Sequence, residues 1–419
     1  MNQLYFLAFR LLPRTTDVFS CIHITINRSV SIAVRKEREI MTTANSTVAR
    51  SAALAIAALA SSFPSIANGA ITLTPAGISQ GFTLSTYATG FPVDTSTSAL
   101  FDPSGQGIGP AGITFTGSNV LIGNATGTLY IMPDVDGQAV TGSTTSVSYS
   151  HPRDAFGLVS AGGTLYMTQQ KVDISHIHIS LPPTADPGSI VQINPNGTLN
   201  QLITNTSTTT VADPYNIPGF STIPISDAPT GIVVNPANGH LIVGTYLGQQ
   251  LLDVNPATKS FTVMRNLASA PDGLAITANA ATLYIAQQTS TGDHVYAYNM
   301  ANIANAPADL GAVSGADGLV LGTGSLANLL FVNTNGGTIV EINLSTLQQT
   351  VIASGGSRGD FAAPDPSNAS MLLTQQTSVV RLLAPPGGGF VGGAPVPEPA
   401  TLGLFTLTLT IMLRRNPRR

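Results

Sequence analysis

Short apolar runs separated by Gly, Pro, Asn and Ser recur along most of this chain, and at regular intervals one of them begins at a glycine. The recurring glycine starts a β-type run in six places: PAGITF at Gly112, AFGLVS at Gly157, PTGIVV at Gly231, PDGLAI at Gly273, ADGLVL at Gly318 and SRGDFA at Gly359. The spacings are 45, 74, 42, 45 and 41 residues. A period of about 40–45 residues is typical of a four-stranded propeller blade.

Second and third β runs follow each glycine, for example TLYIAQQ and HVYAYN after Gly273. Turn residues separate them, which favours strands over helices. We therefore predict an all-β fold, a six-bladed β-propeller over residues 78–384. The 74-residue gap contains a polar insertion at 205–226, and a seven-bladed ring in which this insertion forms a degenerate blade is the alternative.

The last repeat has only three β runs, so one strand of its blade must come from elsewhere. The run GFTLSTYATG at residues 81–90 precedes the first repeat and can supply it. This N-terminal strand would close the ring and remove exposed sheet edges.

Propeller topology predicts where polar residues gather. In each blade the first and second strands are antiparallel, so the first strand starts at the same end of the channel where the second strand ends. Residues beside the repeat glycines should therefore share one rim with the residues at the ends of the second strands. The expected binding residues on this rim are Asp154, Asp272, Asp317, Asp360, Asn333, Gln169, Gln170, Gln287, Gln288, Gln375 and Gln376. Two structural roles compete with binding: aspartate before glycine is ordinary turn chemistry, and the glutamines can cap backbone groups.

His176 and His178 lie on one side of an extended segment and are candidate metal ligands together with His151. The Arg358-Gly359-Asp360 tripeptide falls on a repeat glycine and is interpreted as structural.

The two ends of the chain have the pattern of export signals. We expect residues 1–40 to be a non-native or disordered leader and 41–67 to be a signal peptide, with Arg50, an apolar stretch and small residues before the cleavage site. At the other end, a Gly/Pro-rich linker is expected at 385–395.

Residues 396–419, VPEPATLGLFTLTLTIMLRRNPRR, resemble the PEP-CTERM sorting signal of Gram-negative bacteria. The order of Val396, Pro397, Glu398 and Pro399, an apolar helix, and the basic Arg414 and Arg415 carries the resemblance. It implies transient retention in the inner membrane, processing by an exosortase, and release to the cell surface or outside. The apolar segment is shorter than the roughly 20 residues of a stable span, which suits a temporary stop.

The charge balance narrows the choice of partner. Residues 71–397 contain 17 acidic side chains but only six basic ones: Arg153, Lys171, Lys259, Arg265, Arg358 and Arg381. Nucleic acid is therefore not expected as a partner, because phosphate binding needs clustered cations. The single cysteine, Cys21, excludes a disulfide framework.

The glycine and LYI/LYM pattern of the repeats resembles six-bladed propellers of the NHL and gluconolactonase-like superfamily. That resemblance implies a metal-dependent hydrolase with a divalent cation such as calcium in the channel. The expected ligands are incomplete, since Glu341 is the only glutamate of the repeats and falls in a third strand. The residues alone name no cofactor and do not decide whether the protein is an enzyme. They favour an exported binding module for polysaccharide or a surface protein, with the hydrolase and a purely structural surface protein as alternatives.

Overall fold

The computed structural model describes residues 24–27, 31–34, 70–95, 107–140, 145–150, 153–170, 188–194, 196–203, 211–212, 222–223, 228–289 and 291–391. The chain divides into two units. In the first, strands β1 (Ile24–Asn27) and β2 (Ser31–Val34) form an antiparallel pair. The expected signal and tail helices lie outside the described residues. Within the described ranges, no helix is long and apolar enough to cross a membrane.

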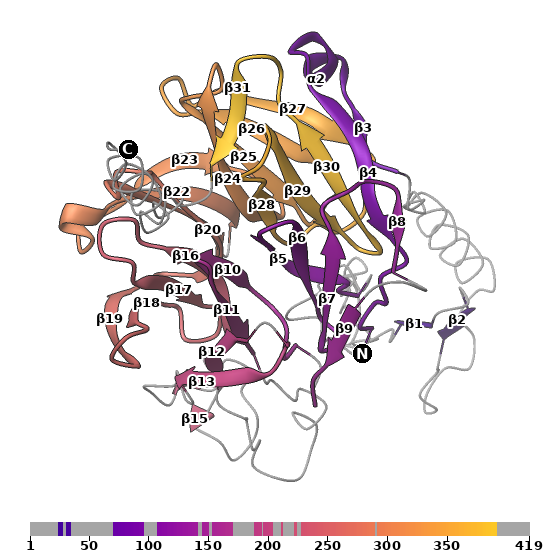
Figure 1. Ribbon diagram of the computed structural model, residues 1–419. Helices are drawn as coiled ribbons and strands as arrows, with labels where there is room; N and C mark the ends of the chain where they lie inside the picture. Colours follow the sequence, from indigo (N-terminus) through magenta and orange to yellow (C-terminus); the bar gives the residue numbers. More distant parts are fainter. Residues whose placement is uncertain are drawn as a thin grey trace, which may run out of the picture. The chain divides into compact units, whose positions relative to one another are not determined.

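The second unit is a ring of six sheets that follow one another in sequence order (Figure 1). Blade 1 contains β5 (Pro110–Thr116), β6 (Asn119–Asn124), β7 (Thr128–Pro133) and β9 (Thr145–Ser148). Blade 2 contains β10 (Leu158–Ala161), β11 (Thr164–Gln169), β12 (Ser189–Ile193) and β13 (Leu199–Ile203). Blade 3 contains β16 (Pro229–Val234), β17 (Leu241–Thr245), β18 (Gln250–Asn255) and β19 (Ser260–Asn266).

Blades 4 to 6 complete the ring. Blade 4 contains β20 (Ala270–Ile276), β21 (Thr282–Thr289), β22 (Gly292–Asn299) and β23 (Ala308–Ala312). A short 3-10 helix, η2 (Met300–Asn302), lies between β22 and β23. Blade 5 contains β24 (Ala316–Gly324), β25 (Leu329–Thr334), β26 (Ile339–Asn343) and β27 (Gln349–Ser354). Blade 6 contains β28 (Ala362–Pro364), β29 (Ser370–Gln375), β30 (Ser378–Leu383) and β4 (Thr83–Thr89). The six-bladed prediction is confirmed.

The insertion between blades 2 and 3 contributes a two-stranded pair, β14 (Val211–Ala212) with β15 (Thr222–Ile223), rather than a seventh four-stranded blade.

Asparagine turns recur at the ends of third strands. The side chains of Asn255, Asn299 and Asn343 each accept a hydrogen bond from the backbone N–H two residues later. This local bond stabilises the turn to the fourth strand.

The repeat glycines are required because neighbouring blades approach closely around the channel. A Cβ added to Gly112 would lie 1.8 Å from the Phe156 carbonyl oxygen, and one added to Gly273 would lie 1.8 Å from that of Asp317. Each of these carbonyls immediately precedes the first-strand glycine of the next blade. Any larger side chain would force the blades apart. The repeated glycine is therefore a packing requirement of the ring.

The N-terminal strand closes the ring as predicted, because β4 pairs with β30 along Thr83–Leu383 to Thr89–Ser378. Before β4, β3 (Thr72–Leu73) adds to the outer edge of β27, and α2 (Pro75–Ser79) begins at the cap Thr74. On the other edge of β4, β8 (Gln138–Ala139) pairs in parallel. The segment before β4 thus adds a strand to blade 5, and a segment that follows the third strand of blade 1 adds one to the closing blade.

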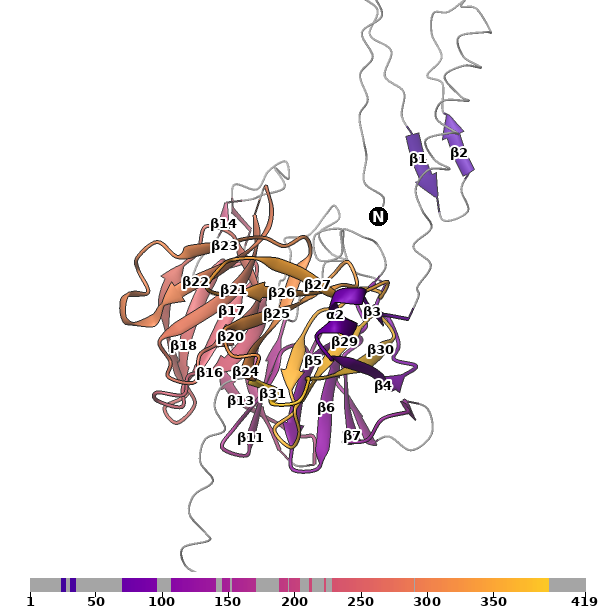
Figure 2. The ribbon, with the colours of Figure 1, turned by 90° about the horizontal axis from the view of Figure 1, so that it is seen from above.

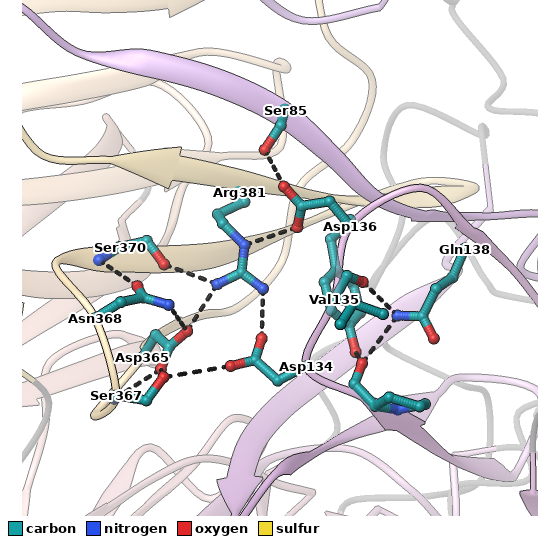
Figure 3. A network of polar contacts seen from close by, with 12 residues as sticks. Ser85, Asp134, Val135, Asp136, Gln138, Asp365, Ser367, Asn368, Ser370 and Arg381 are labelled. Carbon is teal, nitrogen blue, oxygen red and sulfur yellow. Dashed lines mark hydrogen bonds and ion pairs between the residues drawn. The ribbon is translucent and has the colours of Figure 1, made fainter.

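An arginine latch fastens the closing blade to blade 1 (Figure 3). Arg381 on β30 donates from Nε to Asp136 Oδ1 at 2.8 Å, from Nη1 to Asp365 Oδ2 at 2.7 Å, and from Nη2 to Asp134 Oδ1. Nη1 also donates to Ser370 Oγ at 2.8 Å. Asp134 and Asp136 follow the third strand of blade 1, so the latch joins the last repeat to the first.

The C-terminal end of the propeller differs from the expected linker. Strand β31 (Gly388–Val391) pairs with the free inner edge of β24, from Gly388–Gly324 to Val391–Leu321 (Figure 2). Phe390 is buried and its ring meets that of Phe331 edge-on, with centroids 5.1 Å apart. The prediction that a flexible linker begins at 385 is corrected, because one bulky apolar side chain among the glycines anchors this segment to the core.

Candidate functional site

The strand register shows which residues occupy equivalent positions in different blades. Leu274 pairs with Ile285, Leu319 with Val332, and Ala362 with Leu373. Counting from these pairs places Asp272, Asp317 and Asp360 at one equivalent position, two residues before the paired residue of the first strand. The sixth repeat was misaligned in the sequence interpretation. Phe361, rather than Gly359, follows the equivalent aspartate.

The same register defines a second layer on the rim, three residues after the paired residue of the second strand. Gln170, Tyr246, Gln288, Asn335 and Gln376 occupy this layer. We call Asp272, Asp317 and Asp360, with Arg358, Tyr246, Gln288 and Asn335, the rim cluster. Blades 3 to 6 supply all seven residues, so the cluster lies on one side of the ring.

Hydrogen bonds connect the rim cluster from blade to blade. Tyr246 of blade 3 donates its hydroxyl hydrogen to Gln288 Oε1, and Gln288 Nε2 donates to Asp272 Oδ2 at 3.4 Å. Asn335, with its amide oriented to suit its neighbours, donates to Asp317 Oδ2 at 3.2 Å and to the Gly359 carbonyl at 2.8 Å. Asp317 Oδ1 has no hydrogen-bond partner among the described residues.

Arg358 supplies the positive charge of the cluster. Its Nη2 donates to Asp360 Oδ1 at 2.7 Å and its Nε donates to the same oxygen at 3.1 Å. Both side chains are buried. Arg358 and Asp360 therefore form a buried ion pair, and their charges act in opposite directions on the pKa of Asp272. The sequence pattern had indicated only a structural role for the tripeptide.

The surroundings make the carboxyl groups unusually basic. Burial raises the pKa of Asp272 to about 7, and the negative charge of Asp360 adds to the rise while Arg358 opposes it. Burial, followed by the charges of Asp272 and Asp360, holds the pKa of Asp317 well above its usual value. Burial, with nearby Asp272 and Asp317, also raises the pKa of the Tyr246 phenol. The cluster therefore holds protons at neutral pH and offers both hydrogen-bond donors and acceptors.

Three of the glutamines predicted at the rim form hydrogen bonds within the propeller itself. Gln169 Nε2 donates to the Asp154 carbonyl at 3.1 Å, and its Oε1 accepts from Ser189 at 2.7 Å. Gln287 accepts from Tyr298 at 3.2 Å. Gln375 Oε1 accepts from the Ser357 N–H at 2.9 Å. Gln169 and Gln375 thus bond to backbone groups, as in the structural alternative for the glutamines, whereas Gln287 bonds to a side chain.

Asn333 does not reach the rim layer. Its Nδ2 donates to the carbonyls of Phe361 at 3.3 Å and Thr374 at 3.1 Å, which ties blade 5 to blade 6. Gln170, Gln376 and Asp154 are buried at the rim in blades 2 and 6. The sequence interpretation did not include Asn335 or Tyr246, and it gave Arg358 no binding role. The register of the second strands is the signal that would have identified Asn335 and Tyr246.

The sequence resemblance implies a divalent cation in the channel. No three His, Cys, Asp or Glu side chains in the described parts of the chain are arranged to hold a metal ion. The guanidinium of Arg358 supplies the cationic partner of Asp360. Glu341 lies on β26 with its pKa raised by burial, away from the first strands. His151, His176, His178 and the sorting residues lie outside the described residues.

An aromatic contact joins the starts of the first strands of two blades that are not neighbours in the ring. Phe156 of blade 2 and Phe361 of blade 6 meet edge-on with centroids 5.7 Å apart, although blade 1 separates their blades in the ring. The contact therefore reaches across part of the channel.

Comparisons with known proteins agree with this architecture. A gluconolactonase of Xanthomonas campestris, described as important in glucose secondary metabolic pathways, has 12% identity, a TM-score of 0.50, and coverage of 76% of this chain and 95% of its own. A structural-genomics protein described as a gluconolactonase has 12% identity, a TM-score of 0.50, and coverage of 78% and 100%. A luciferin-regenerating enzyme has 12% identity, a TM-score of 0.50, and coverage of 75% and 99%.

The fold is a six-bladed β-propeller similar to those of these solved structures. At 12% identity these likenesses concern the fold alone. No family model matches the chain, and no curated protein matches it by sequence.

Proposed function

We propose that this protein is an exported propeller whose rim cluster binds a neutral, hydroxyl-rich ligand of the kind presented by polysaccharide. The observation that carries the proposal is the convergence of carboxyl, amide and phenol groups from four blades on one side of the channel. Sugar hydroxyls donate and accept hydrogen bonds at once, and the cluster offers both roles. Polar groups fixed at the end of rigid strands are typical of ligand sites.

The charge of the repeats favours a neutral ligand. Residues 71–397 contain 17 acidic and six basic side chains, and two of the basic ones, Arg358 and Arg381, are paired with aspartates. An acidic polysaccharide would be repelled by this field. Export through the inner membrane, handling by an exosortase and residence at the surface of a Gram-negative bacterium form part of the proposal, which rests there on the signals at the two ends of the sequence.

Binding of neutral and acidic oligosaccharides to the purified full chain tests the site. We expect Asp317→Asn to weaken binding of a neutral oligosaccharide at least tenfold, because Asp317 is central in the cluster and its Oδ1 has no hydrogen-bond partner among the described residues. Asp309→Asn is the matched control, since Asp309 lies on the outermost strand of blade 4 and pairs with His294 there. Equal affinity of the two variants, or binding of acidic glycans alone, would contradict the proposal.

Hydrolysis of a sugar lactone is a second candidate, favoured by one observation. A carboxyl group with a pKa of about 7, as in Asp272, suits general acid–base catalysis at neutral pH. In this reading, Asp272 in its ionised form would accept a proton from water as the water attacks the lactone carbonyl. Lactone turnover that is lost in Asp272→Asn and rises with pH through about 7 would favour the hydrolase. Ligand binding without turnover would favour the binding module.

A further inference from the structure

A second cavity occupies the opposite end of the channel from the rim cluster. Its volume is about 930 Å³, near the upper end of the roughly 300–1,000 Å³ usual for ligand pockets. The first strands of successive blades contribute apolar residues to its lining, including Phe115, Leu158, Val234, Leu274 and Leu319, and polar residues such as Thr116 and Ser160 line the rest. The apolar part of this surface favours an apolar side chain over water.

Strand β31 forms part of the wall of this cavity. Gly389, Phe390 and Val391 all line it. β24 starts beside the rim at Ala316 and ends at Gly324, and β31 runs antiparallel to it. The chain therefore travels along β31 from the far end of the channel toward the rim, and the last described residue, Val391, stands at the cavity itself.

The chain that follows has the chemistry to fill the cavity. Ten residues, 392–401, separate Val391 from the apolar run at 402–413. Even fully extended, a linker of that length spans at most about 33–36 Å. A tether this short keeps the run close to the cavity and raises its local concentration there above that of a separate chain.

We propose that the cavity is the docking site of the chain's own apolar run, beginning with residues 402–405, whenever that run is not in a membrane. The volume admits part of the run rather than all of it, so the first bulky side chains, Leu404 and Phe405, are the natural occupants. Docking would shelter them from water and from other chains. This inference is independent of ligand binding at the rim, because it concerns the opposite end of the channel.

Cysteine crosslinking in the full chain tests the proposal. The background variant is Cys21→Ser, which removes the single native cysteine. The test pair is Ser160→Cys with Leu404→Cys, since Ser160 lines the cavity. The matched control pair is Thr377→Cys with Leu404→Cys, since Thr377 is exposed in the turn after β29, on the rim side.

We expect the intramolecular disulfide to form at least fivefold faster in the test pair than in the control pair. Added phospholipid vesicles should slow it, because they offer the run an alternative apolar environment. Equal rates in the two pairs, no disulfide in either, or disulfides only between two chains would each overturn the proposal. The last result would assign the cavity to a second copy of the chain.

Discussion

Two clusters in this propeller use the same ingredients, one arginine and three aspartates, with opposite results. At the latch, all three aspartates bond directly to the guanidinium of Arg381. Hydrogen bonds from Ser367 and Arg381 outweigh the effect of burial and lower the pKa of Asp365. In the rim cluster, the two bonds of Arg358 described above both go to Asp360, and burial raises the pKa of Asp272 and Asp317.

The difference shows what geometry does to buried charge. A guanidinium has five N–H donors in a fixed fork, and at the latch these donors face separate carboxylates. Asp134 still has a raised pKa, through its burial and the nearby charge of Asp365, despite its bond to Arg381. In the rim cluster, burial and neighbouring carboxylates raise the pKa of Asp272 and Asp317. The latch therefore stabilises the ring, whereas the rim cluster keeps polar groups ready for a ligand.

Arg381→Met should produce the largest effect. The substitution leaves Asp134 and Asp365 buried without their cationic partner, and removing one member of a buried pair costs about 3–5 kcal/mol. Because the latch joins the closing blade to blade 1, we expect the loss to appear as cooperative unfolding of the whole propeller. Urea denaturation of the full chain at pH 7 measures it.

Lys259→Met is the control for Arg381→Met, since Lys259 is an exposed residue of a surface turn. It should change the free energy of unfolding by less than about 0.5 kcal/mol. If both substitutions had the same small effect, the latch would be a surface feature without a role in closure.

The two clusters should also respond oppositely to pH. Asp272 holds its proton up to about pH 7 in the folded chain, but releases it near pH 4 when unfolded. Between these values the folded chain binds the extra proton, so the stability due to this group is lost as pH rises. Asp272→Asn should therefore match the parent at pH 4 and exceed it by on the order of a few kcal/mol at pH 8.

Asp365→Asn is expected to have the reverse profile. The pKa of Asp365 is lowered in the folded chain, so its stabilising effect is present above about pH 4 and disappears as pH falls below that value. The variant should be less stable than the parent at pH 8 and approach it in acid. Urea midpoints at pH 4 and pH 8 compare both variants. A loss of stability at pH 8 in Asp272→Asn would show that the rim carboxylate is stabilised as an anion.

The sequence predicted the architecture because periodic packing constraints leave periodic residues. Glycine recurs in five blades where neighbouring first strands approach closely, as at Gly112 and Gly273, and the incomplete last repeat identified the closing strand β4. The C-terminal boundary was missed because Phe390 stands among glycines that are typical of linkers. Strand β31 depends on a long-range pairing with β24 that local composition does not record.

The candidate site was predicted only in outline. Propeller topology predicted that Asp272, Asp317 and Asp360 share one rim. Their exact layer required the strand register, and the repeat alignment was two residues out of register at Gly359. Asn335, rather than Asn333, occupies the rim layer for the same reason. The pKa of Asp272 depends on burial and on charges from other blades, and neither is visible in a linear pattern.

Two tyrosines give the smallest and most specific comparison between the clusters. Tyr87, stacked 5.5 Å from the Arg381 guanidinium, donates its hydroxyl hydrogen to the Pro133 carbonyl at 2.7 Å, while Tyr246 donates to Gln288 in the rim cluster. Replacing either with Phe removes one hydrogen bond and should cost about 0.5–1.5 kcal/mol in urea denaturation. Binding of the neutral oligosaccharide should separate them. Tyr246→Phe is expected to weaken it several-fold, because Gln288 loses the bond that orients its amide, whereas Tyr87→Phe should leave it unchanged. Equal affinities would mean that ligand contacts do not include this part of the rim.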